Sequence, residues 1–377
     1  MSQIVEIRKA DDPRTVIHQA VQILKSGGLI GLPTETGYTV AAAPSRPDAV
    51  QRLRKLGESV FADPPVLAVF DTIDAQRIVA DVGEIGRKFL RRCWPGPVTL
   101  CFVPDAGDLE AKRAAPVSTI ALSGEARKAL AVDGIRLRMT AHPVVQAVLD
   151  QLGEPLALSG EVTSKSGLIR TASELVAVTG SQMDLVVDDG PSRFGSPTTV
   201  VRVGSSTWSI QREGVVSARI IARLACDVYL FVCTGNTCRS PMAEALSRKL
   251  LAGRLNCAEE ELVDRGYVIE SAGIAAILGC PPSPEAVNIL RNRGVNLHSH
   301  ASQPLTERLL QHADHIFTMT HGHRDSILWG HPELEDRVQV LARDNSDIPD
   351  PIGLGLAEYQ KCADEIERHV RQILPLS

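Results

Sequence analysis

Residues 228–241 read Val-Tyr-Leu-Phe-Val-Cys233-Thr-Gly-Asn-Thr-Cys-Arg239-Ser240-Pro241. The apolar run before Cys233 is rich in β-branched and aromatic residues, which favours a strand. Ser240 followed by Pro241 is typical of a helix start, with the serine as N-cap and the proline at the first helical position. The order strand, tight loop and helix predicts an α/β fold in this part of the chain.

The loop between this strand and this helix has the composition of an anion site. Backbone N–H groups and the positive end of a helix converge there, which suits a phosphate dianion. Gly235 is expected to supply the unusual backbone angles that the loop needs. The same field, with Arg239 nearby, should stabilise Cys233 as a thiolate nucleophile for phosphoryl transfer. Asp350, between two prolines, is a candidate general acid, with an ordinary turn aspartate as the alternative.

The spacing Cys-x5-Arg alone is weak evidence, because it occurs a second time at Cys362 and Arg368. The second match lies in a helical-looking segment, whose backbone amides are already hydrogen-bonded within the helix and cannot wrap around an anion. The context of strand, loop and helix therefore distinguishes the first match from the second.

The whole chain has 377 residues, which is more than one hydrophobic core normally serves. Its composition, 44% hydrophobic and 23% charged, is that of an ordinary soluble globular protein. The net charge of -5 gives no reason to expect nucleic-acid binding from charge alone. We find neither a leader segment nor an apolar window long enough for a membrane span, so we expect a cytoplasmic protein without membrane contact.

Strand-like runs alternate with helical stretches along the whole chain, which predicts two α/β domains. We expect the seam near residues 212–226, where residues 218–224 have the pattern of a short helix. The two domains are accordingly placed at residues 1–222 and 223–377. The clearest strand-like runs of the first domain begin at Leu29, Val66, Val98, Leu185 and Thr198.

Residues 227–377 resemble the low-molecular-weight protein phosphatases. The matching landmarks are the loop at 233–240, Ser271-Ala-Gly273, residues 293–300, Asp350-Pro-x-Gly and a closing helix from Leu356. The resemblance implies a parallel sheet flanked by helices, and catalysis that needs no metal or cofactor. It implies that Cys233 is the nucleophile that becomes a phosphocysteine, Arg239 the phosphate clamp, and Asp350 the acid and later the base. The phosphate-loop residues that it implies are Thr234, Gly235, Asn236, Thr237, Cys238 and Ser240, with Asn236 and Ser240 as loop organisers.

Within that family the sequence most resembles the bacterial protein-arginine phosphatases. Thr237 stands where tyrosine phosphatases place isoleucine or leucine. Ile277 and Ile352 stand where relatives place the aromatic residues that would sandwich a phosphotyrosine ring, and the second of these also departs from the arginine branch. The resemblance implies a phosphorylated protein as substrate, with phosphoarginine on one side and phosphotyrosine or broad specificity on the other as the alternatives.

Two histidine pairs, His298 with His300 and His321 with His323, raise the alternative of a zinc site. Structural zinc usually has four ligands in closely spaced pairs, and the sequence contains no Cys-x2-Cys to complete them. We therefore expect no metal at these residues and interpret them as surface or helix-capping histidines.

Residues 1–217 resemble the YrdC-like family, the threonylcarbamoyl-AMP synthases that act in tRNA adenosine modification. The landmarks are residues 28–38, Lys55, a Trp94-Pro-Gly-Pro turn, residues 138–143, 158–161, 196–200 and 212–214. The resemblance implies a twisted mixed sheet, with ATP and Mg²⁺, threonine and bicarbonate as ligands. It implies tRNA, double-stranded RNA or the tRNA-modification machinery as partners. The residues that it implies for nucleotide and threonine contacts are Thr34, Tyr38, Lys55, Arg138, Ser159, Ser196 and Arg212.

Two departures from that family fall where ATP is expected. Gly57 and Glu161 stand at positions where family members have an arginine and an asparagine. A carboxylate at position 161 is unfavourable near triphosphate oxygens unless a metal, a lysine or an arginine compensates it. The alternatives are an active synthase, a catalytically silent module that binds a nucleotide or RNA or regulates the phosphatase, and an enzyme of some other nucleotide-dependent carbamoylation. In a further alternative both domains are silent and form a phosphate-sensing or RNA-binding scaffold.

Overall fold

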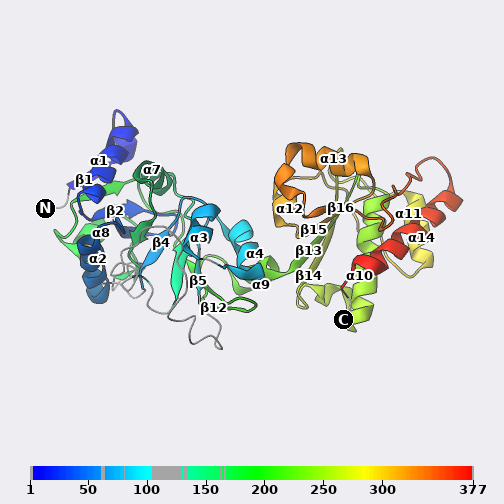
Figure 1. Ribbon diagram of the computed structural model, residues 1–377, viewed down its shortest axis with the longest axis horizontal. Coiled ribbons are helices and arrows are strands. Elements are labelled where there is room, and N and C mark those ends of the chain that lie inside the picture. Colours follow the sequence, from blue (N-terminus) through cyan, green and yellow to red (C-terminus); the bar gives the residue numbers. More distant parts are fainter. Residues whose placement is uncertain are drawn as a thin grey trace. The chain divides into compact units, whose positions relative to one another are not determined.

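The computed structural model describes residues 3–60, 64–79, 81–103, 130, 134–161, 163–164 and 167–375. The chain divides into two compact units, residues 1–224 (unit 1) and 225–377 (unit 2) (Figure 1). Both units are α/β, and the predicted fold class is confirmed: unit 1 has a large mixed sheet, and unit 2 has a parallel sheet with helices. Within the described ranges, no helix is both long and apolar enough to cross a membrane.

The strands of unit 1 form one mixed sheet in the order β1-β10-β2-β3-β7-β4-β6-β5-β11-β12. The five strand-like runs of the sequence fall on β2, β4, β5, β10 and β11, although β4 ends at Ala68, before its apolar run does. The strands are β1 Gln3–Glu6, β2 Ile30–Pro33, β3 Tyr38–Ala42, β4 Val66–Ala68, β5 Val98–Phe102, β6 Ile135–Arg138, β7 Leu156–Leu158, β10 Leu185–Asp188, β11 Thr199–Val203 and β12 Trp208–Arg212, with β8 Thr163–Ser164 and β9 Gly167–Leu168 as a separate hairpin.

Helices cover this sheet because their apolar residues repeat at helical spacing. α1 begins after Asp12, whose side chain accepts the backbone N–H of Arg14 at 2.9 Å and so caps the helix. Its buried face packs with α7 against the sheet. The helices of unit 1 are α1 Pro13–Lys25, α2 Pro47–Val60, α3 Thr72–Ile78, α4 Gly83–Cys93, α7 Pro143–Leu152, α8 Ala172–Thr179 and α9 Ala218–Ala225, with the 3-10 turn η1 at Ile7–Lys9.

Gly31 in β2 permits the close approach of α8 to the sheet. A Cβ atom at this position would lie 2.7 Å from Leu175 Cδ2 in α8, a distance that side chains do not adopt. Ile30 and Leu32, on the opposite side of the strand, belong to the core cluster formed with α1 and α7. The sheet of unit 1 therefore has helices on both faces.

Unit 2 has a parallel sheet in the order β14-β13-β15-β16. The expected helix from Leu356 is present as α14, and it contains both Cys362 and Arg368, so the second Cys-x5-Arg match lies inside a helix as predicted. The elements are β13 Asp227–Cys233, β14 Tyr267–Gly273, β15 His315–Thr318, β16 Val338–Val340, α10 Arg239–Leu255, α11 Pro284–Asn292, α12 Glu307–His312, α13 His321–Gly330 and α14 Leu356–Ile373, with 3-10 turns η2 Glu259–Leu262 and η3 Pro332–Leu334.

The two faces of β13 supply two separate cores. Tyr229 and Phe231 belong to a cluster with α10, α11 and α14, whereas Leu230 and Val232 belong to a cluster with α12 and α13 (Figure 1). A strand buried on both faces reads as a continuous apolar run, which is what the sequence shows before Cys233. The carboxyl ends of the parallel strands meet at one edge of the sheet, where ligands of such folds usually bind.

Candidate functional site

The loop that follows β13 gathers polar groups around the sulfur of Cys233. Cys233 is the last residue of β13, and only 3% of its surface is exposed. Its Sγ lies 2.9 Å from Ser240 Oγ and accepts the backbone N–H of Asn236 at 3.3 Å. The strand, loop and helix predicted around Cys233 are therefore present.

The predicted helix cap is wrong. α10 begins at Arg239, and Cys238 is the N-cap, with no hydrogen bond from its side chain to the helix. The hydroxyl of Ser240 cannot cap because it is directed back into the loop, where it accepts from Asn236 Nδ2 at 3.0 Å. Pro241 is then the third helical residue, still in the first turn, where its missing N–H breaks no helical bond.

The prediction that Gly235 supplies the unusual backbone angles is also wrong. Asn236 adopts the left-handed conformation, with φ of 54°, which asparagine tolerates better than most residues. Its side chain holds it there, because Nδ2 donates to Ser240 Oγ and, at 2.9 Å, to Ser271 Oγ. Its Oδ1 accepts the backbone N–H of Gln303 at 2.8 Å. One residue thus supplies both the turn and the contacts that tie the loop to β14.

Gly273, at the end of β14, allows the loop to lie against the sheet. A Cβ atom at this position would lie 2.5 Å from the carbonyl oxygen of Thr234 and 2.9 Å from the backbone nitrogen of Asn236. Both approaches are too close for any side chain. The Ser271-Ala-Gly273 motif therefore holds the loop against the end of β14. Ser271 contributes a hydroxyl that binds Asn236, and Gly273 contributes the space that a side chain would fill.

Arg239 and Asp350 meet at the loop. The Arg239 side chain is 6% exposed, and its guanidinium donates to the carbonyl oxygen of Ile348 at 3.1 Å and to the carboxylate of Asp350. The Asp350 side chain is 43% exposed. The structure thus brings the predicted phosphate clamp and the predicted acid together from distant parts of the chain.

The remaining predicted loop residues lie around this centre. The side chain of Thr237 lies over Gly235, because a Cβ atom added there would be 3.6 Å from Thr237 Oγ1. Cys238 is buried, with its Sγ 3.3 Å from the hydroxyl of Tyr359 in α14. Ile277 and Ile352, which stand where aromatic residues occur in relatives, are 74% and 63% exposed.

Two of the four histidines contact the loop, so their interpretation as surface or capping residues is wrong. His323 Nε2 lies 2.9 Å from Thr234 Oγ1, and burial, followed by the positive charge of Arg239, lowers the pKa of His323. His300 Nε2 lies 2.9 Å from the carbonyl oxygen of Asn236, and burial lowers the pKa of His300 as well. Among the residues that the structure describes, no three His, Cys, Asp or Glu side chains are grouped as metal ligands.

Glu244 is a partly buried acid of this site that sequence reasoning missed. Its Oε2 accepts the hydroxyl of Ser271 at 2.6 Å, and burial raises the pKa of Glu244 to about 7. The sequence does contain a signal for this residue. Glu244 is the single charged residue in the run Met242-Ala-Glu-Ala-Leu246, and the other four residues of the run are buried. A charged residue on a buried helix face usually has a specific partner.

Unit 1 contains a pocket with an empty volume of about 490 Å³, including space open to solvent. Lys55 on α2 and the exposed Ser196 do not line the pocket, in contrast to the expectation for nucleotide contacts. The other predicted contact residues line it: Thr34, Tyr38, Arg138, Ser159 and Arg212.

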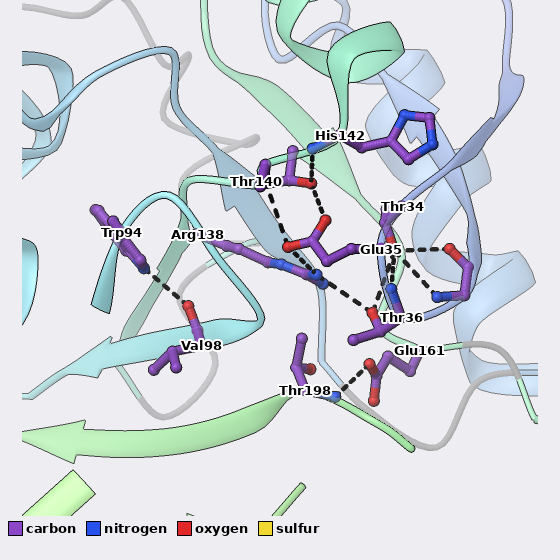
Figure 2. Close-up of polar contacts among 12 residues, drawn as sticks. Thr34, Glu35, Thr36, Trp94, Val98, Arg138, Thr140, His142, Glu161 and Thr198 are labelled. Carbon is purple, nitrogen blue, oxygen red and sulfur yellow. Dashed lines mark hydrogen bonds and ion pairs between the residues drawn. The ribbon is translucent and has the colours of Figure 1, made fainter. Parts of the chain in front are cut away.

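Arg138 is the most buried cation of the pocket. Its Nη2 lies 3.0 Å from Glu35 Oε1 and donates to Thr36 Oγ1 at 3.2 Å (Figure 2). Burial by itself raises the pKa of Glu35, but Arg138 and the Thr140 hydroxyl outweigh it and hold the pKa below its ordinary value. The Nε of Arg138 is buried, and no group of the described residues accepts a hydrogen bond from it. Within the part of the chain that the structure describes, this guanidinium therefore keeps one donor free for a ligand.

Glu161 forms an ion pair that neutralises its charge. Its carboxylate accepts from Arg212 Nη2 at 2.7 Å and from the backbone N–H of Thr198 at 2.6 Å, the second contact being drawn in Figure 2. The arginine required to compensate the unexpected carboxylate is therefore present, and it is one of the predicted contact residues.

Several other polar groups of unit 1 are used within the fold. Tyr38 donates to Asp188 Oδ1 at 2.9 Å, and burial raises its pKa. Ser159 Oγ accepts the backbone N–H of Val40 at 3.0 Å. The Trp94 motif forms a turn, as expected, with the indole N–H donating to the carbonyl oxygen of Val98 at 2.8 Å (Figure 2).

Comparisons with known proteins assign both units to families. Residues 22–214 match the Sua5/YciO/YrdC family, which is described as "Telomere recombination", and residues 228–376 match the family described as "Low molecular weight phosphotyrosine protein phosphatase". The chain belongs to the Sua5/YciO/YrdC family and carries a low-molecular-weight phosphatase domain as its second part.

Several bacterial phosphatases are similar to the second part. A protein-arginine-phosphatase of Bacillus subtilis is 37% identical over 148 residues, which are 38% of this chain and 92% of that protein. A probable low-molecular-weight protein-tyrosine-phosphatase, EpsP of Ralstonia nicotianae, is 34% identical over 147 residues, which are 39% of this chain and 92% of that protein. A crystal structure of a YwlE mutant from Bacillus subtilis is 36% identical, with a TM-score of 0.35, and the match covers 39% of this chain and 95% of that chain.

Proposed function

We propose that unit 2 hydrolyses phosphorylated protein residues through a phosphocysteine. The observation that carries this proposal is the arrangement of Cys233, Arg239 and Asp350 around one loop at the carboxyl end of β13. The backbone amides and the guanidinium would bind the oxygens of a phosphoryl group and stabilise the charge of the transition state. No metal and no cofactor is needed for this step.

The reaction proceeds in two displacements. The thiolate of Cys233 attacks phosphorus, so an S–P bond forms while the bond from phosphorus to the leaving nitrogen or oxygen breaks. Asp350 gives its proton to that leaving atom. The Asp350 carboxylate then takes a proton from a water molecule that attacks phosphorus, and the S–P bond breaks to return the thiolate and release inorganic phosphate.

Phosphoarginine is the substrate that we favour over phosphotyrosine. The relatives named protein-arginine-phosphatase match unit 2 at 37% and 36% identity. Thr237 offers the loop a hydroxyl, which suits a polar guanidino group better than an aromatic ring. Ile277 and Ile352 lack the flat aromatic faces that stack on a phenyl ring. Phosphotyrosine stays the second candidate because EpsP, a probable tyrosine phosphatase, is also similar.

Replacing Thr237 by isoleucine tests this choice. We expect Thr237→Ile to lower kcat/KM for a phosphoarginine peptide about tenfold, the factor that corresponds to one hydrogen bond, and to leave a phosphotyrosine peptide unaffected. The measurement is phosphate release from both peptides under one set of conditions. Hydrolysis of p-nitrophenyl phosphate by the variant serves as the control for an intact loop. An equal loss on both peptides, or a wild-type preference for phosphotyrosine, would contradict the assignment.

For unit 1 we propose that the pocket binds ATP, as Mg²⁺-ATP, and makes threonylcarbamoyl-AMP from threonine and bicarbonate. The support is the family match, the predicted residues that line the pocket, and the unsatisfied donor of Arg138. The ion pair of Glu161 with Arg212 removes the repulsion that a bare carboxylate would exert on a triphosphate. The product would supply tRNA modification, with tRNA or its modifying machinery as partner. A silent regulatory module is the alternative.

Pyrophosphate release by the whole protein tests the synthase. We expect release from ATP that depends on both threonine and bicarbonate. Arg212→Gln should weaken ATP binding, because it leaves the charge of Glu161 uncompensated, whereas Glu161→Gln should retain binding, since its amide oxygen still accepts from Thr198 N–H. Calorimetric titration with ATP compares the two variants. A protein that hydrolyses a phosphorylated test substrate but releases no pyrophosphate would carry a silent first unit.

A further inference from the structure

A chain of hydrogen bonds connects the partly buried carboxyl of Glu244 to Cys233. Ser271 Oγ donates to Glu244 Oε2 at 2.6 Å. Asn236 Nδ2 donates to Ser271 Oγ at 2.9 Å and to Ser240 Oγ at 3.0 Å. Ser240 Oγ in turn lies 2.9 Å from Cys233 Sγ. A carboxyl on the second turn of α10 is thus linked through three side chains to the sulfur at the end of β13.

The orientation of the Asn236 amide determines the direction of this chain. Its Oδ1 accepts the backbone N–H of Gln303 at 2.8 Å, so its Nδ2 must face the two serines. An amide NH2 group only donates, and therefore both Ser240 and Ser271 accept from it. Each serine must then direct its own hydrogen to another acceptor.

The two serine hydrogens have different acceptors. Ser271 directs its hydrogen to the carboxyl of Glu244. Ser240 has Cys233 Sγ at 2.9 Å and, more weakly, the carbonyl oxygen of Ala272 at 3.4 Å. The shorter contact is the sulfur, and a hydroxyl that donates to a thiolate stabilises it. The fixed amide therefore leaves the Ser240 hydroxyl as a donor toward Cys233.

We propose that Glu244 is a positioning residue of the phosphate loop, which accepts from Ser271 and thereby holds the Asn236 amide so that Ser240 donates to the sulfur of Cys233. The inference rests on the proposed phosphatase function, because it concerns the reactivity of the same cysteine. Glu244 touches no substrate and acts only through the intervening side chains.

The charge of Glu244 is set by its surroundings on α10 and β14. Burial raises its pKa to about 7, against the hydrogen bond from Ser271 and the charge of Arg248, which lower it, and with a further increase from Glu270. The ionised carboxylate is the stronger acceptor, and the 2.6 Å contact has the length of a charge-assisted bond. The link to Ser271 therefore strengthens as the pH rises through about 7.

Ionisation of the Glu244 carboxyl also lowers the stability of the fold. Because folding raises the pKa from 4.5 to about 7, the stability that Glu244 contributes is complete below 4.5 and is lost as the pH rises through about 7. Glutamine at this position does not titrate. Glu244→Gln should therefore gain thermal stability over the wild type as the pH rises through that window, which thermal unfolding at a series of pH values measures.

The reactivity of Cys233 in the full chain tests the positioning role. We expect Glu244→Ala to slow alkylation of Cys233 by iodoacetamide about tenfold, and to lower kcat/KM for p-nitrophenyl phosphate equally. Glu244→Gln should restore most of both rates, because its amide oxygen can accept from Ser271. Ser271→Ala removes the same link and should reproduce the loss, and the double variant should lose no more than either single one.

A matched control separates this link from the general effect of charge. Glu270→Gln removes a neighbouring carboxylate that raises the pKa of Glu244, so it should keep the wild-type rates or increase them slightly. Wild-type rates in both Glu244→Ala and Ser271→Ala would overturn the inference and leave the phosphatase standing. A wild-type protein that neither hydrolyses the test phosphate nor reacts at Cys233 would remove the phosphatase function itself. If Glu244→Ala does not fold, Glu244→Gln provides the test. We expect ionisation of Glu244 to increase the alkylation rate of the wild type near pH 7, and we expect Glu244→Gln to lack this increase. The same increase in both proteins would overturn the inference.

Discussion

Cys233→Ser should abolish phosphate release by unit 2, with a loss of at least about 10,000-fold. A serine hydroxyl has nearly the shape of the thiol and retains a neighbour in Ser240 Oγ, 2.9 Å from the present sulfur. It is not ionised at neutral pH, however, so it is a weak nucleophile without an adjacent base. The unfolding free energy should change by no more than about 1 kcal/mol, because the substitution is almost isosteric. Phosphate release and chemical denaturation measure the two effects.

Cys362→Ser is the matched control for this substitution. Cys362 is a second buried cysteine with the Cys-x5-Arg spacing, and its Sγ lies 3.8 Å from the carbonyl oxygen of Pro349. Burial raises the pKa of its thiol to about 12, so it is neutral and unreactive. We expect activity within about twofold of the wild type. Loss of activity in this variant, with activity retained in Cys233→Ser, would exclude the phosphate-loop assignment.

Asp350→Asn should slow turnover by about 100- to 10,000-fold, the usual contribution of a general acid and base. An asparagine oxygen can still accept from Arg239, but the side chain has no proton to give to the leaving group. The loss should therefore be smaller for p-nitrophenyl phosphate, whose leaving group needs little protonation, than for a phosphorylated peptide. Comparing kcat for the two substrates separates acid catalysis from a general distortion of the loop.

Asp347→Asn is the corresponding control in the same segment. Asp347 Oδ1 accepts the backbone N–H of His321 at 2.8 Å, and this bond, followed by one from the imidazole of His321, lowers the pKa of Asp347. Its side chain is 52% exposed and contacts His321, the first residue of α13, instead of Arg239. We expect activity close to the wild type. Equal losses in the two variants would mean that Asp350 acts only through the conformation of its loop.

Much of the phosphate-loop site could be predicted from the sequence because its main parts are local. The strand that ends at Cys233 and the helix that follows it are neighbours in the chain, and their composition indicates both elements. Asp350 lies far away in sequence, and only the family resemblance connected it to Arg239. The structure confirms that the two side chains meet.

The parts of the site that could not be predicted depend on contacts between distant residues. The left-handed conformation of Asn236 is stabilised by Ser271 and Gln303, so local preference pointed to Gly235 instead. The role of His323 likewise depends on Thr234, which is 89 positions away. Neither contact has a signature in the spacing of residues.

In unit 1 the sequence predicts that a compensating cation is needed, but it does not identify the residue that supplies it. Electrostatics alone indicated that Glu161 needed a cation, but could not say which of the arginines would supply it. The structure identifies Arg212, which is 51 positions away and which the family resemblance predicts as a ligand contact. Lys55 and Ser196, assigned by resemblance, lie outside the pocket lining.

The contact between Arg239 and Asp350 also bears on how a phosphatase of this kind would release its product. The guanidinium is nearly buried, at 6% exposure, so a departing phosphate ion would otherwise leave an unpaired cation in a poorly hydrated place. The Asp350 carboxylate can pair with Arg239 as soon as the phosphate leaves. Because it belongs to the same chain, its effective concentration near Arg239 is high. Competition from Asp350 should weaken the binding of inorganic phosphate to the loop. We therefore expect weak product inhibition and rapid product release.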